Sequence, residues 1–426
     1  MVEMKDIYAA YLVARHNKRR SADSVEYELH IEANLRKLLD EINGRTLRPT
    51  AYTFITMKPR PREIFACEMG LRIVDHYMDI RLRPLLEKRF TDRSFNNRLG
   101  LGAKAAINQL ATDIYEVSSG YTRDAYVIKI DLKGYFPNAS QDRVYEQLRQ
   151  VIEEDYEGED KDDMLYMLMA SVYSYPTKHC YRKSPLWKWS YMPSDKSVFT
   201  KPDGIGGCIG RLLWQNAMNY YLNDFDWWVI NNVCPHYVRF VDDMVFVVED
   251  KDAFLPYLED IRAKLAECGC RMHPTKFYCQ HYAKGVEFIG SVIQGSRIYV
   301  ASRTIRNTRK AITDLNRCAR PQKLTEFLSS LNSYLGIYKT RDGLKRADAL
   351  KDEVSIKWWA YCSVDENTKA IKALPGYGYH DRIRRKYKLK YYKHGYKRRN
   401  RKAQKCAGVS QTGKRGAAGI QGLCRK

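Results

Sequence analysis

The sequence predicts an α+β fold that ends in a separate helical unit. Residues 125–131 and 237–248 are rich in β-branched and aromatic residues, which is typical of strands. Apolar residues at helical spacing surround these segments, and the helical pattern runs from residue 301 to about 372. The chain has 426 residues, of which 44% are hydrophobic, so it is long enough to bury two or three structural units. These figures exclude a disordered or purely fibrous protein.

The individual elements follow from the periodicity of the apolar residues. Apolar residues three or four positions apart predict helices over 1–50, 71–90, 140–153, 210–228, 252–268 and 301–372. Runs of strand-forming residues predict strands over 125–131, 237–240, 244–248 and 286–292. A basic, proline-containing segment predicts a loop over 58–64, and an acidic polar segment covers 153–163. The two strands that flank Val241-Asp242-Asp243 are expected to form a hairpin.

The distribution of charge points to a polyanionic partner. The chain carries 73 Lys and Arg against 50 Asp and Glu, which gives a net charge of +23. A membrane partner is disfavoured, because no run approaches the ~20 apolar residues of a membrane span and the N-terminus lacks the apolar core of a signal peptide. We therefore expect a cytoplasmic protein. The eleven cysteines have no regular spacing, which fits reduced thiols in that compartment.

A basic tail, residues 376–426, contains seventeen Lys and Arg and one acid, so it carries +16 of the total charge. Lys and Arg neutralise phosphates and tyrosine rings stack on unpaired bases, so the tail predicts binding to RNA or single-stranded DNA. The residues expected to bind RNA are Arg382, Arg384, Arg385, Lys386, Tyr391, Tyr392, Arg398 and Arg399. A solvated, partly flexible tail is the competing interpretation.

Two adjacent carboxylates, Asp242 and Asp243, lie between apolar strand-forming runs. Carboxylates in such surroundings are costly unless a cation neutralises them. A hairpin could present them beside a third acid, Asp131, which ends the strand predicted over 125–131. Such an oxygen cage suits two Mg²⁺ ions about 4 Å apart, with Mn²⁺ as a substitute, which could activate a 3′-hydroxyl and stabilise a leaving pyrophosphate. A surface turn would explain Asp242-Asp243 alone, but not its combination with Asp131.

Seven short blocks follow one another over about residues 55–295. They are Arg60-Pro-Arg62-Glu-Ile, Ser94-Phe-Asn-Asn-Arg98 with Ala105-Ala-Ile, Asp131 with Tyr135-Phe136, Ile209-Gly210 with Trp214-Gln215, Phe240-Val-Asp-Asp, Met272-His-Pro-Thr-Lys276, and Gly285-Val-Glu-Phe-Ile-Gly290. In this order they resemble the motifs of bacterial, retroelement-derived reverse transcriptases. Each block is weak alone, and the order makes the resemblance specific.

The resemblance implies a right-hand polymerase fold and RNA-directed DNA synthesis. Residues 1–110 would form the fingers with an N-terminal helical extension. Residues 111–295 would form the palm, an antiparallel sheet packed on helices, together with some of the fingers and an insertion near 153–203. Residues 296–375 would form a helical thumb, which the basic tail follows.

The resemblance also implies roles for the metal site. Asp131, Asp242 and Asp243 would be the catalytic carboxylates, and with Leu132 they would form the Mg²⁺ site. Phe288 and Gly290 would belong to the primer grip.

Further residues would contact the incoming nucleotide. They are Arg60, Arg62, Phe136, Gly210, Gln215 and Lys276. Arg62 would hold the triphosphate through bidentate contacts, Phe136 would be a steric gate against the 2′-hydroxyl, and Lys276 would neutralise or protonate pyrophosphate. The competing interpretations are a core aromatic for Phe136 and a solvated surface lysine for Lys276.

The subgroup follows less directly from the motifs. Gln215 resembles the diversity-generating retroelements, which usually show Ser-Gln, whereas Trp214 departs from them. Defence-associated reverse transcriptases are the alternative. We expect a structured, locally encoded noncoding RNA as template, a DNA product or primer, and dNTPs, with an accessory protein or a homo-oligomer left open. In the insertion, Trp187, Trp189 and Tyr191 would either pack on the palm or contact RNA.

Three rival functions stay open at this stage. An RNA-dependent RNA polymerase would share the carboxylates, although Phe136 argues for dNTPs. A maturase would be an RNA-binding module, and a template-independent or protein-primed polymerase would need no added RNA.

Two other candidate sites are disfavoured. Cys268-Gly-Cys270, with His273, Cys279 and His281, has the residue types of a zinc site, but its spacing is too tight. The glycine-rich segment 204–210 lacks the Gly-Lys-Ser/Thr ending of a phosphate loop.

Overall fold

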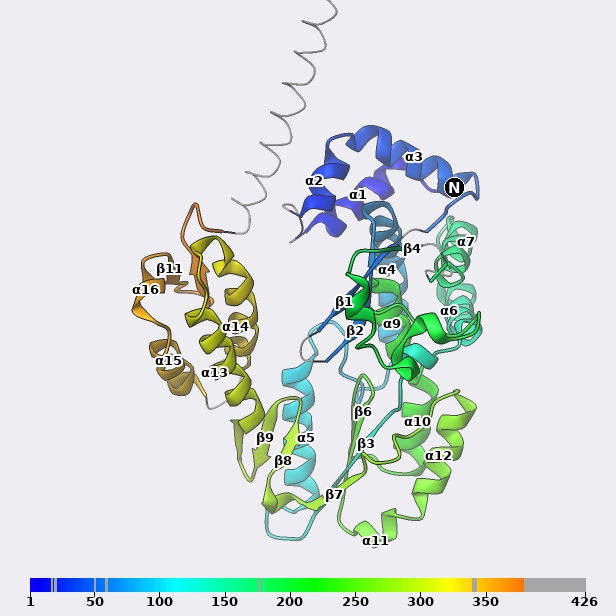
Figure 1. The fold of residues 1–426 in the computed structure, drawn as a ribbon. Helices are drawn as coiled ribbons and strands as arrows, with labels where there is room; N and C mark the ends of the chain where they lie inside the picture. The colour runs from blue at the N-terminus through cyan, green and yellow to red at the C-terminus, as the bar shows by residue number, and fades with distance from the viewer. Residues whose placement is uncertain are drawn as a thin grey trace, which may run out of the picture. The chain divides into compact units, whose positions relative to one another are not determined.

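The computed structural model describes residues 1–378 except 17, 19–20, 50, 58–59, 175–176, 179 and 339–342, and it leaves the side chains of 22, 52 and 322 undescribed. The chain divides into two compact units. The first comprises Met1–Lys310 and Ser333–Asp352, and the second comprises Ala311–Asn332 and Glu353–Lys426. Figure 1 shows the elements of both units, each of which is considered by itself.

The first unit contains a four-stranded antiparallel sheet in the order β5-β6-β3-β7 (Figure 1). Its strands are β3 (Tyr126–Asp131), β5 (Tyr237–Phe240), β6 (Asp243–Val248) and β7 (Tyr278–His281). The predicted strands at 125–131, 237–240 and 244–248 are confirmed to within one residue. β7 was not predicted, because its partly buried residues lack the run of apolar residues that marks the other three strands.

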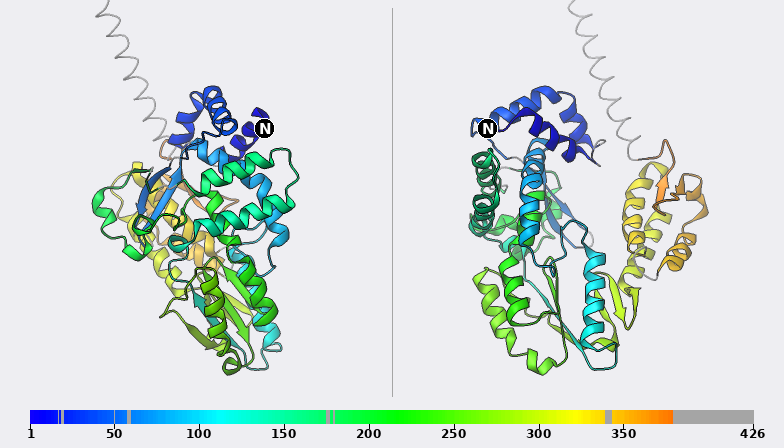
Figure 2. Two further views of the ribbon diagram at one scale, coloured as in Figure 1. Left: turned by 90° about the vertical axis from the view of Figure 1, so that its right-hand side faces the viewer. Right: turned by 180° about the vertical axis from the view of Figure 1, so that it is seen from behind.

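Helices cover both faces of this sheet, as Figures 1 and 2 show. Side chains alternate between the faces along each strand. Val127 packs in a cluster with α5 (Ala103–Val117), whereas its neighbour Ile128 packs in the larger core. The larger core includes side chains of α6 (Gln141–Asp155), α9 (Leu212–Tyr220), α10 (Asn223–Asn232) and α12 (Tyr257–Glu267). The predicted α+β class, with an antiparallel sheet packed on helices, is therefore confirmed.

A second, three-stranded sheet has the order β2-β1-β4. β1 (Ala51–Thr56) and β2 (Arg62–Cys67) form an antiparallel hairpin, and β4 (Cys180–Arg182) runs parallel to β1. The predicted loop over 58–64 is wrong at its end, because β2 already begins at Arg62. β1 was not predicted, because its sequence Ala-Tyr-Thr-Phe-Ile-Thr is short and mixes polar with apolar residues.

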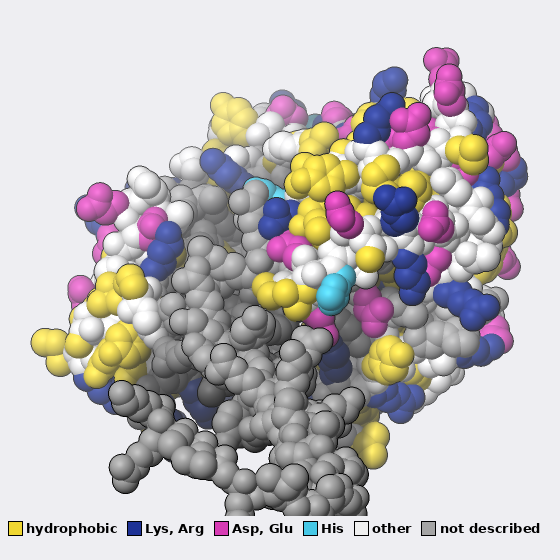
Figure 3. Space-filling model, turned by 90° about the horizontal axis from the view of Figure 1, so that it is seen from above, with side chains coloured by type: hydrophobic (Ala, Val, Ile, Leu, Met, Phe, Trp, Pro, Cys, Tyr) yellow, Lys and Arg dark blue, Asp and Glu magenta, His cyan; other side chains and the backbone are white. Residues whose placement is uncertain are grey.

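The predicted helix over 1–50 is a group of three helices. They are α1 (Met4–Arg15), α2 (Ala22–Glu28) and α3 (Ile31–Asn43). Ser21 caps α2, since its Oγ accepts a hydrogen bond from the backbone N–H of Ser24 at 3.3 Å. In the view from above, hydrophobic side chains stand among both signs of charge over these helices, so this face is not uniformly basic (Figure 3).

α1 packs on α4 (Met69–Arg89), which confirms the helix predicted over 71–90. Two other predicted helices are interrupted. The helix over 210–228 is split into α9 and α10, and the helix over 252–268 into α11 (Lys251–Phe254) and α12 on either side of Pro256. α5, α7 (Lys161–Val172) and the short α8 (Leu186–Trp189) were not predicted.

The strand predicted over 286–292 is wrong as a single element. The chain there forms β8 (Val286–Phe288), β9 (Ser291–Gln294) and β10 (Arg297–Val300), which pair antiparallel in the order β10-β9-β8. Ile289 and Gly290 have φ of 45° and 72°, and two successive residues with positive φ make a tight hairpin turn. This turn reverses the chain in the middle of the predicted strand.

The end of the described chain is mostly helical, as predicted. It contains α13 (Ser302–Asn316), α14 (Leu324–Tyr338), α15 (Leu344–Asp352) and α16 (Ile356–Trp359). The uninterrupted helical pattern is wrong after α16, where β11 (Cys362–Val364) and β12 (Ile371–Ala373) form a hairpin. The side chain of Asp365 accepts hydrogen bonds from the N–H and hydroxyl of Thr368, both at 2.6 Å, which stabilises the turn.

None of the helices in the described part of the chain combines the length and the apolar character that a membrane span requires. The RNA-binding residues expected between 382 and 399 lie outside the described residues.

Candidate active site

Strand pairing brings three carboxylates together at one end of the four-stranded sheet. Asp131, the last residue of β3, is the register partner of Asp243, the first residue of β6. Residues directly opposite each other on antiparallel strands point to the same face, so these two carboxylates are neighbours. Asp242 follows Val241 in the two-residue turn between β5 and β6, where Val241 has a φ of 61°. The backbone geometry of this turn therefore places Asp242 beside the Asp131–Asp243 pair.

The carboxylates at this end of the sheet disfavour one another's charge. Asp243 as a whole residue is exposed to solvent, but its carboxyl group is surrounded by protein. This burial, together with the charges of Asp242 and Asp131, raises the pKa of Asp243 to about 6. Burial and the charge of Asp131 also raise the pKa of Asp242, against the opposing charges of Lys276 and Arg62. A cation bound among these groups would relieve the repulsion.

Two lysines stand beside these acids. Nζ of Lys276 donates a hydrogen bond to Oδ1 of Asp131 at 2.7 Å. Lys129, two residues before Asp131 on β3, donates to the backbone carbonyl of Glu287 at 2.6 Å, and burial lowers its pKa. Asp131, Asp242 and Asp243 lie at the same end of the sheet, although their ligand atoms do not all lie within 4.8 Å of one another. Carboxylate oxygens are the hard ligands that Mg²⁺ prefers. The residues present therefore fit a divalent cation.

The turn that carries Asp242 is stabilised by a hydrogen bond from Arg239, which is fully buried on β5. Its guanidinium forms an ion pair with the fully buried Asp226, with Nε 2.7 Å from Oδ1, and its NH1 donates to the carbonyl of Val241 at 3.2 Å. The sequence-based prediction missed this pair. The only signal was an arginine inside an apolar strand, three residues before Asp242.

Among the predicted nucleotide-binding residues, Arg62 lies near the carboxylates, since its charge acts on Asp242. It is exposed at the start of β2, and Arg60 is exposed in the preceding loop. Phe136 lies in a short 3₁₀ turn, Phe136–Asn138, where it is half-buried against the core. Its ring meets that of Tyr135 edge-on at 5.9 Å. Phe136 therefore combines core packing with a partly accessible ring.

Gly210 lies against β2, because the N–H of Phe65 donates to the carbonyl of Ile209 at 2.7 Å. A Cβ at Gly210 would stand 2.8 Å from the carbonyl oxygen of Phe65, so only glycine fits this approach. Gly210 and Gln215 line a cavity of about 570 Å³ between α1, α4 and α9. None of the three carboxylates lines it.

The remaining predicted site residues are partly structural. Leu132 follows Asp131, and its apolar side chain is buried, so only its backbone carbonyl could serve a metal. Phe288 is buried in the core at the end of β8. Gly290 lies in the β8–β9 turn, where its carbonyl accepts a hydrogen bond from Ala301 N–H at 3.1 Å.

The disfavoured zinc site finds no support in the geometry. Among the described residues, no three of Cys268, Cys270, His273, Cys279 and His281 bring ligand atoms within 4.8 Å of one another. His281 instead contacts Asp124, with 3.2 Å between Nε2 and Oδ1.

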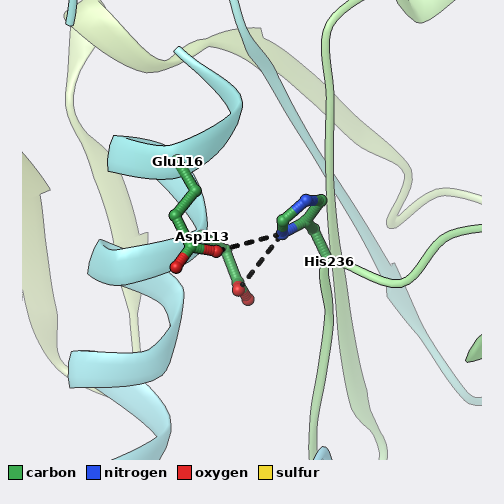
Figure 4. A group of neighbouring side chains, drawn as sticks. All are labelled: Asp113, Glu116 and His236. Atoms are coloured by element: carbon green, nitrogen blue, oxygen red, sulfur yellow. Dashed lines mark hydrogen bonds and ion pairs between the residues drawn. The ribbon is translucent and has the colours of Figure 1, made fainter. Parts of the chain in front are cut away.

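A second group of titratable side chains, Asp113, Glu116 and His236, lies at the opposite end of β5 from the Asp242 turn (Figure 4). Nδ1 of His236 is 3.4 Å from Oδ1 of Asp113 and 3.7 Å from Oε2 of Glu116. Arg93 donates to the same Asp113 oxygen at 2.8 Å. Ion pairing therefore accounts for this cluster, which ties α5 to the start of β5.

A four-stranded antiparallel sheet covered by helices, with carboxylates and cations gathered at one end, defines a polymerase-type palm. Residues 56–293 match the family described as reverse transcriptase (RNA-dependent DNA polymerase). This match covers more than half of the 426 residues, so the chain belongs to the reverse transcriptase family. The predicted enzyme class, an RNA-directed DNA polymerase, is confirmed at the level of the family.

Several solved structures show similarity at low identity. Apo telomerase from Candida tropicalis is 12% identical, with 72% of this chain and 55% of that chain covered and a TM-score of 0.44. Telomerase from Candida albicans in complex with a fragment of telomeric RNA is 12% identical, with 77% and 60% covered and a TM-score of 0.42. The chain thus spans little more than half the length of these proteins. No sequence among the curated proteins matches the chain.

Proposed function

We propose that this protein synthesises DNA on an RNA template, with Asp131, Asp242 and Asp243 as the ligands of two Mg²⁺ ions. The observation that carries the proposal is the convergence of these three carboxylates at one end of the sheet, where burial and mutual repulsion raise the pKa of Asp242 and Asp243. Leu132 could contribute its backbone carbonyl. Bound divalent cations would make a primer 3′-hydroxyl a better nucleophile and neutralise the departing pyrophosphate.

The chain's own cations would position the phosphates of the nucleotide. Arg62 is exposed and its charge reaches Asp242, so it is suited to hold the triphosphate, with Arg60 beside it in sequence. Lys276 now bonds to Asp131 and could transfer its contact to the leaving pyrophosphate. Gly210 and Gln215 would then line the path of the nucleotide and the template.

Two further assignments concern the primer and the sugar of the nucleotide. Phe136 follows Asp131 by five residues and keeps part of its ring accessible, which suits a gate against the 2′-hydroxyl. Phe288 and Gly290, at the β8–β9 turn, would belong to the primer grip. The fingers, palm and thumb boundaries given by the sequence are proposed together with these roles.

We also propose that the template is a structured noncoding RNA, held in part by the basic tail with its net charge of +16. The order of the seven blocks and Gln215 favour a bacterial, retroelement-derived enzyme. Its biological role would be antiviral defence or the diversification of a target gene, in the cytoplasm.

Primer extension by the purified full-length protein tests the catalytic assignment. With Mg²⁺, an RNA template and a DNA primer, the wild type should incorporate dNTPs, and Asp242→Asn with Asp243→Asn should lower the rate at least about 10³-fold, since the bound cations provide several kcal/mol of charge stabilisation. Binding of the primer–template should persist in the variant. Equal synthesis by wild type and variant would remove the assignment, and synthesis without RNA would identify a template-independent polymerase.

A further inference from the structure

After β4, the chain of the insertion near 153–203 leaves the three-stranded sheet at Ser184 and contacts it again at Val198, beside the same pair of residues. The backbone N–H of Ile55 on β1 donates to Oγ of Ser184 at 2.9 Å. On the return, the carboxylate of Glu63 on β2 accepts hydrogen bonds from the N–H of Val198 at 2.8 Å and from the hydroxyl of Ser197. Ile55 and Glu63 are register partners in the β1–β2 hairpin. Both ends of the segment 184–198 are therefore fixed to the same pair of residues.

This anchor lies beside the proposed nucleotide site. The next register pair toward the hairpin loop is Thr56 with Arg62. Arg62 is the residue whose charge acts on Asp242. The segment 184–198 thus begins and ends one residue pair away from the guanidinium that would hold the triphosphate.

The inner side of the segment is packed. Trp189 meets Phe199 edge-on with ring centroids 5.2 Å apart, and its Nε1 donates to the carbonyl of Ser184 at 3.3 Å. The guanidinium of Arg182, on β4, lies 4.9 Å from the Trp189 ring and 4.4 Å from the Phe199 ring. Phe199 in turn stacks on Phe65 of β2 at 5.9 Å. Trp189 is therefore a structural anchor, which gives the outer residues a firm support.

The outer side of the segment exposes aromatic rings. Trp187 is 59% exposed and Tyr191 is 60% exposed, and their ring centroids lie 6.2 Å apart at 85°. The ammonium of Lys188 stands 5.6 Å from the Trp187 ring. Over residues 180–192 the chain carries three cations, Arg182, Lys183 and Lys188, and no acid. We refer to Trp187, Lys188 and Tyr191 as the aromatic platform.

We propose that the aromatic platform binds unpaired nucleotides of the RNA strand next to the active site. This inference rests on the proposed function, which it extends by naming a binding surface for single-stranded RNA. Exposed Trp and Tyr rings offer stacking surfaces to bases of any sequence, and adjacent cations neutralise phosphates. The excess of positive charge over residues 180–192 favours a nucleic acid over an acidic or apolar face of another protein as the occupant. The segment that carries the platform is anchored one register pair from Arg62, which suits template nucleotides that have not yet been copied.

Binding of a twelve-nucleotide, unstructured single-stranded RNA to the full-length protein, followed by fluorescence anisotropy, tests the proposal. Trp187→Ala with Tyr191→Ala should weaken binding at least about tenfold and leave the salt dependence unchanged, because stacking releases no counterions. Lys188→Gln should instead reduce the slope of log affinity against log salt by about 0.7. Affinity for a fully paired RNA–DNA duplex should be unchanged in all variants.

Trp227 and Tyr257 provide a matched control, because they are a Trp and a Tyr with 45% and 40% exposure on α10 and α12. Replacing both by Ala should leave affinity for single-stranded RNA within about twofold of wild type. Single variants, Trp187→Gln and Tyr191→Gln, with circular dichroism as a check on folding, guard against a general loss of structure.

The result can be separated from the outcome for the catalytic site. Asp242→Asn with Asp243→Asn should retain platform-dependent RNA binding even though it makes no DNA. If the wild type makes no DNA but its RNA binding depends on Trp187 and Tyr191, the proposed function fails and the platform stands. Wild-type affinity in the Trp187 and Tyr191 variants would overturn the platform. If the Trp187 and Tyr191 variants lose self-association, measured by light scattering, but keep their affinity for RNA, the surface would bind another copy of the chain. That result would also overturn the proposed RNA-binding platform.

Discussion

Nζ of Lys276 lies 2.7 Å from Oδ1 of Asp131, so an ammonium group offsets part of the charge of the three clustered carboxylates. Lys276 precedes β7, and Asp131 ends β3, which is the neighbouring strand in the sheet. A divalent cation bound by Asp131 would compete with this ammonium. We therefore expect a bound cation to displace Lys276 from Asp131, which would allow the ammonium group to contact phosphates in the proposed function.

Lys276→Gln separates these two effects. Binding of Mn²⁺, measured by electron paramagnetic resonance, should become tighter because a competing cation is gone. DNA synthesis at saturating Mg²⁺ should fall about 10²-fold, within the range for loss of a proton donor. Lys133→Gln, two residues after Asp131 in the sequence, serves as a control for the general loss of a positive charge. Unchanged metal affinity and unchanged synthesis in Lys276→Gln would return Lys276 to a surface ion pair.

The raised pKa of Asp243 predicts a pH-dependent loss of stability in the metal-free protein. A carboxyl whose folded pKa, about 6, lies above its ordinary value of about 3.9 contributes stability below pH ~4 that is lost as the pH rises through 6. Asp243→Asn removes this loss, so its melting temperature relative to wild type should rise between pH 4 and pH 7. Thermal unfolding in the presence of a chelator measures the difference.

Two controls accompany the pH series. Asp92→Asn, at a side chain that is 87% exposed, should show no such trend. Added Mg²⁺ should stabilise the wild type more than Asp243→Asn at pH 7, because a ligand stabilises the state that binds it. A constant difference in melting temperature across the pH range would contradict the repulsion among the three carboxylates.

Phe136→Ala tests the sugar gate. Removal of the half-buried ring should open space beside the sugar and raise NTP incorporation relative to dNTP by at least about tenfold, since the discrimination is steric. Single-nucleotide incorporation with each substrate gives the ratio of kcat/KM values. Tyr135→Phe is a control, because it keeps the neighbouring ring and removes only the hydroxyl that donates to the carbonyl of Met218. If Phe136→Ala alters stability but not the ratio, the residue acts in core packing alone.

The buried pair of Arg239 and Asp226 predicts a large loss of stability on truncation. Arg239→Met leaves Asp226 as an uncompensated buried charge, and the free energy of unfolding should fall by about 3–5 kcal/mol. Arg239→Met with Asp226→Asn should recover part of this loss, because the unpaired charge is removed. Chemical denaturation measures both values. Arg149→Met, which breaks solvent-accessible pairs on α6, should cost far less stability than Arg239→Met.

Arg239 also supports the turn that carries Asp242, so its effect should extend to catalysis. In Arg239→Met with Asp226→Asn, the hydrogen bond to the carbonyl of Val241 stays lost even where stability recovers. We therefore expect DNA synthesis to remain about tenfold or more below wild type. Full recovery of synthesis together with stability would confine Arg239 to a role in folding.

The basic tail can be tested by truncation. Deletion of residues 381–426 removes +16 of net charge, and affinity for the cognate RNA and its salt dependence should both decrease, because each phosphate contact contributes about −0.7 to −0.9 to the log–log slope. Synthesis on a short artificial primer–template should continue, since none of the proposed catalytic residues is removed. Unaltered affinity and salt slope would show that the tail is dispensable for RNA binding.

The sequence by itself determined the class of the fold and the chemistry of its centre. Strands rich in β-branched residues identify themselves by local composition, and Asp131 and Asp242-Asp243 stand out because carboxylates are rare beside such strands. The family follows from the order of the seven blocks. These features depend on short-range sequence patterns, so they can be predicted without knowing which distant residues each segment packs against.

The tertiary structure decided what depends on partners distant in the sequence. β1 mixes polar with apolar residues, and a glycine interrupts the segment that forms β8 and β9. The local sequence of these segments therefore does not predict the strand pairings that form them. The buried position of Arg239 follows only from its pairing with Asp226, and Trp187 and Trp189, two residues apart, differ in role because only Trp189 meets Phe199. An arginine in a strand or a tryptophan in a loop has the same local pattern whether it is buried or exposed. Long-range packing alone buries Arg239 behind the turn that carries Asp242 and leaves Trp187 exposed.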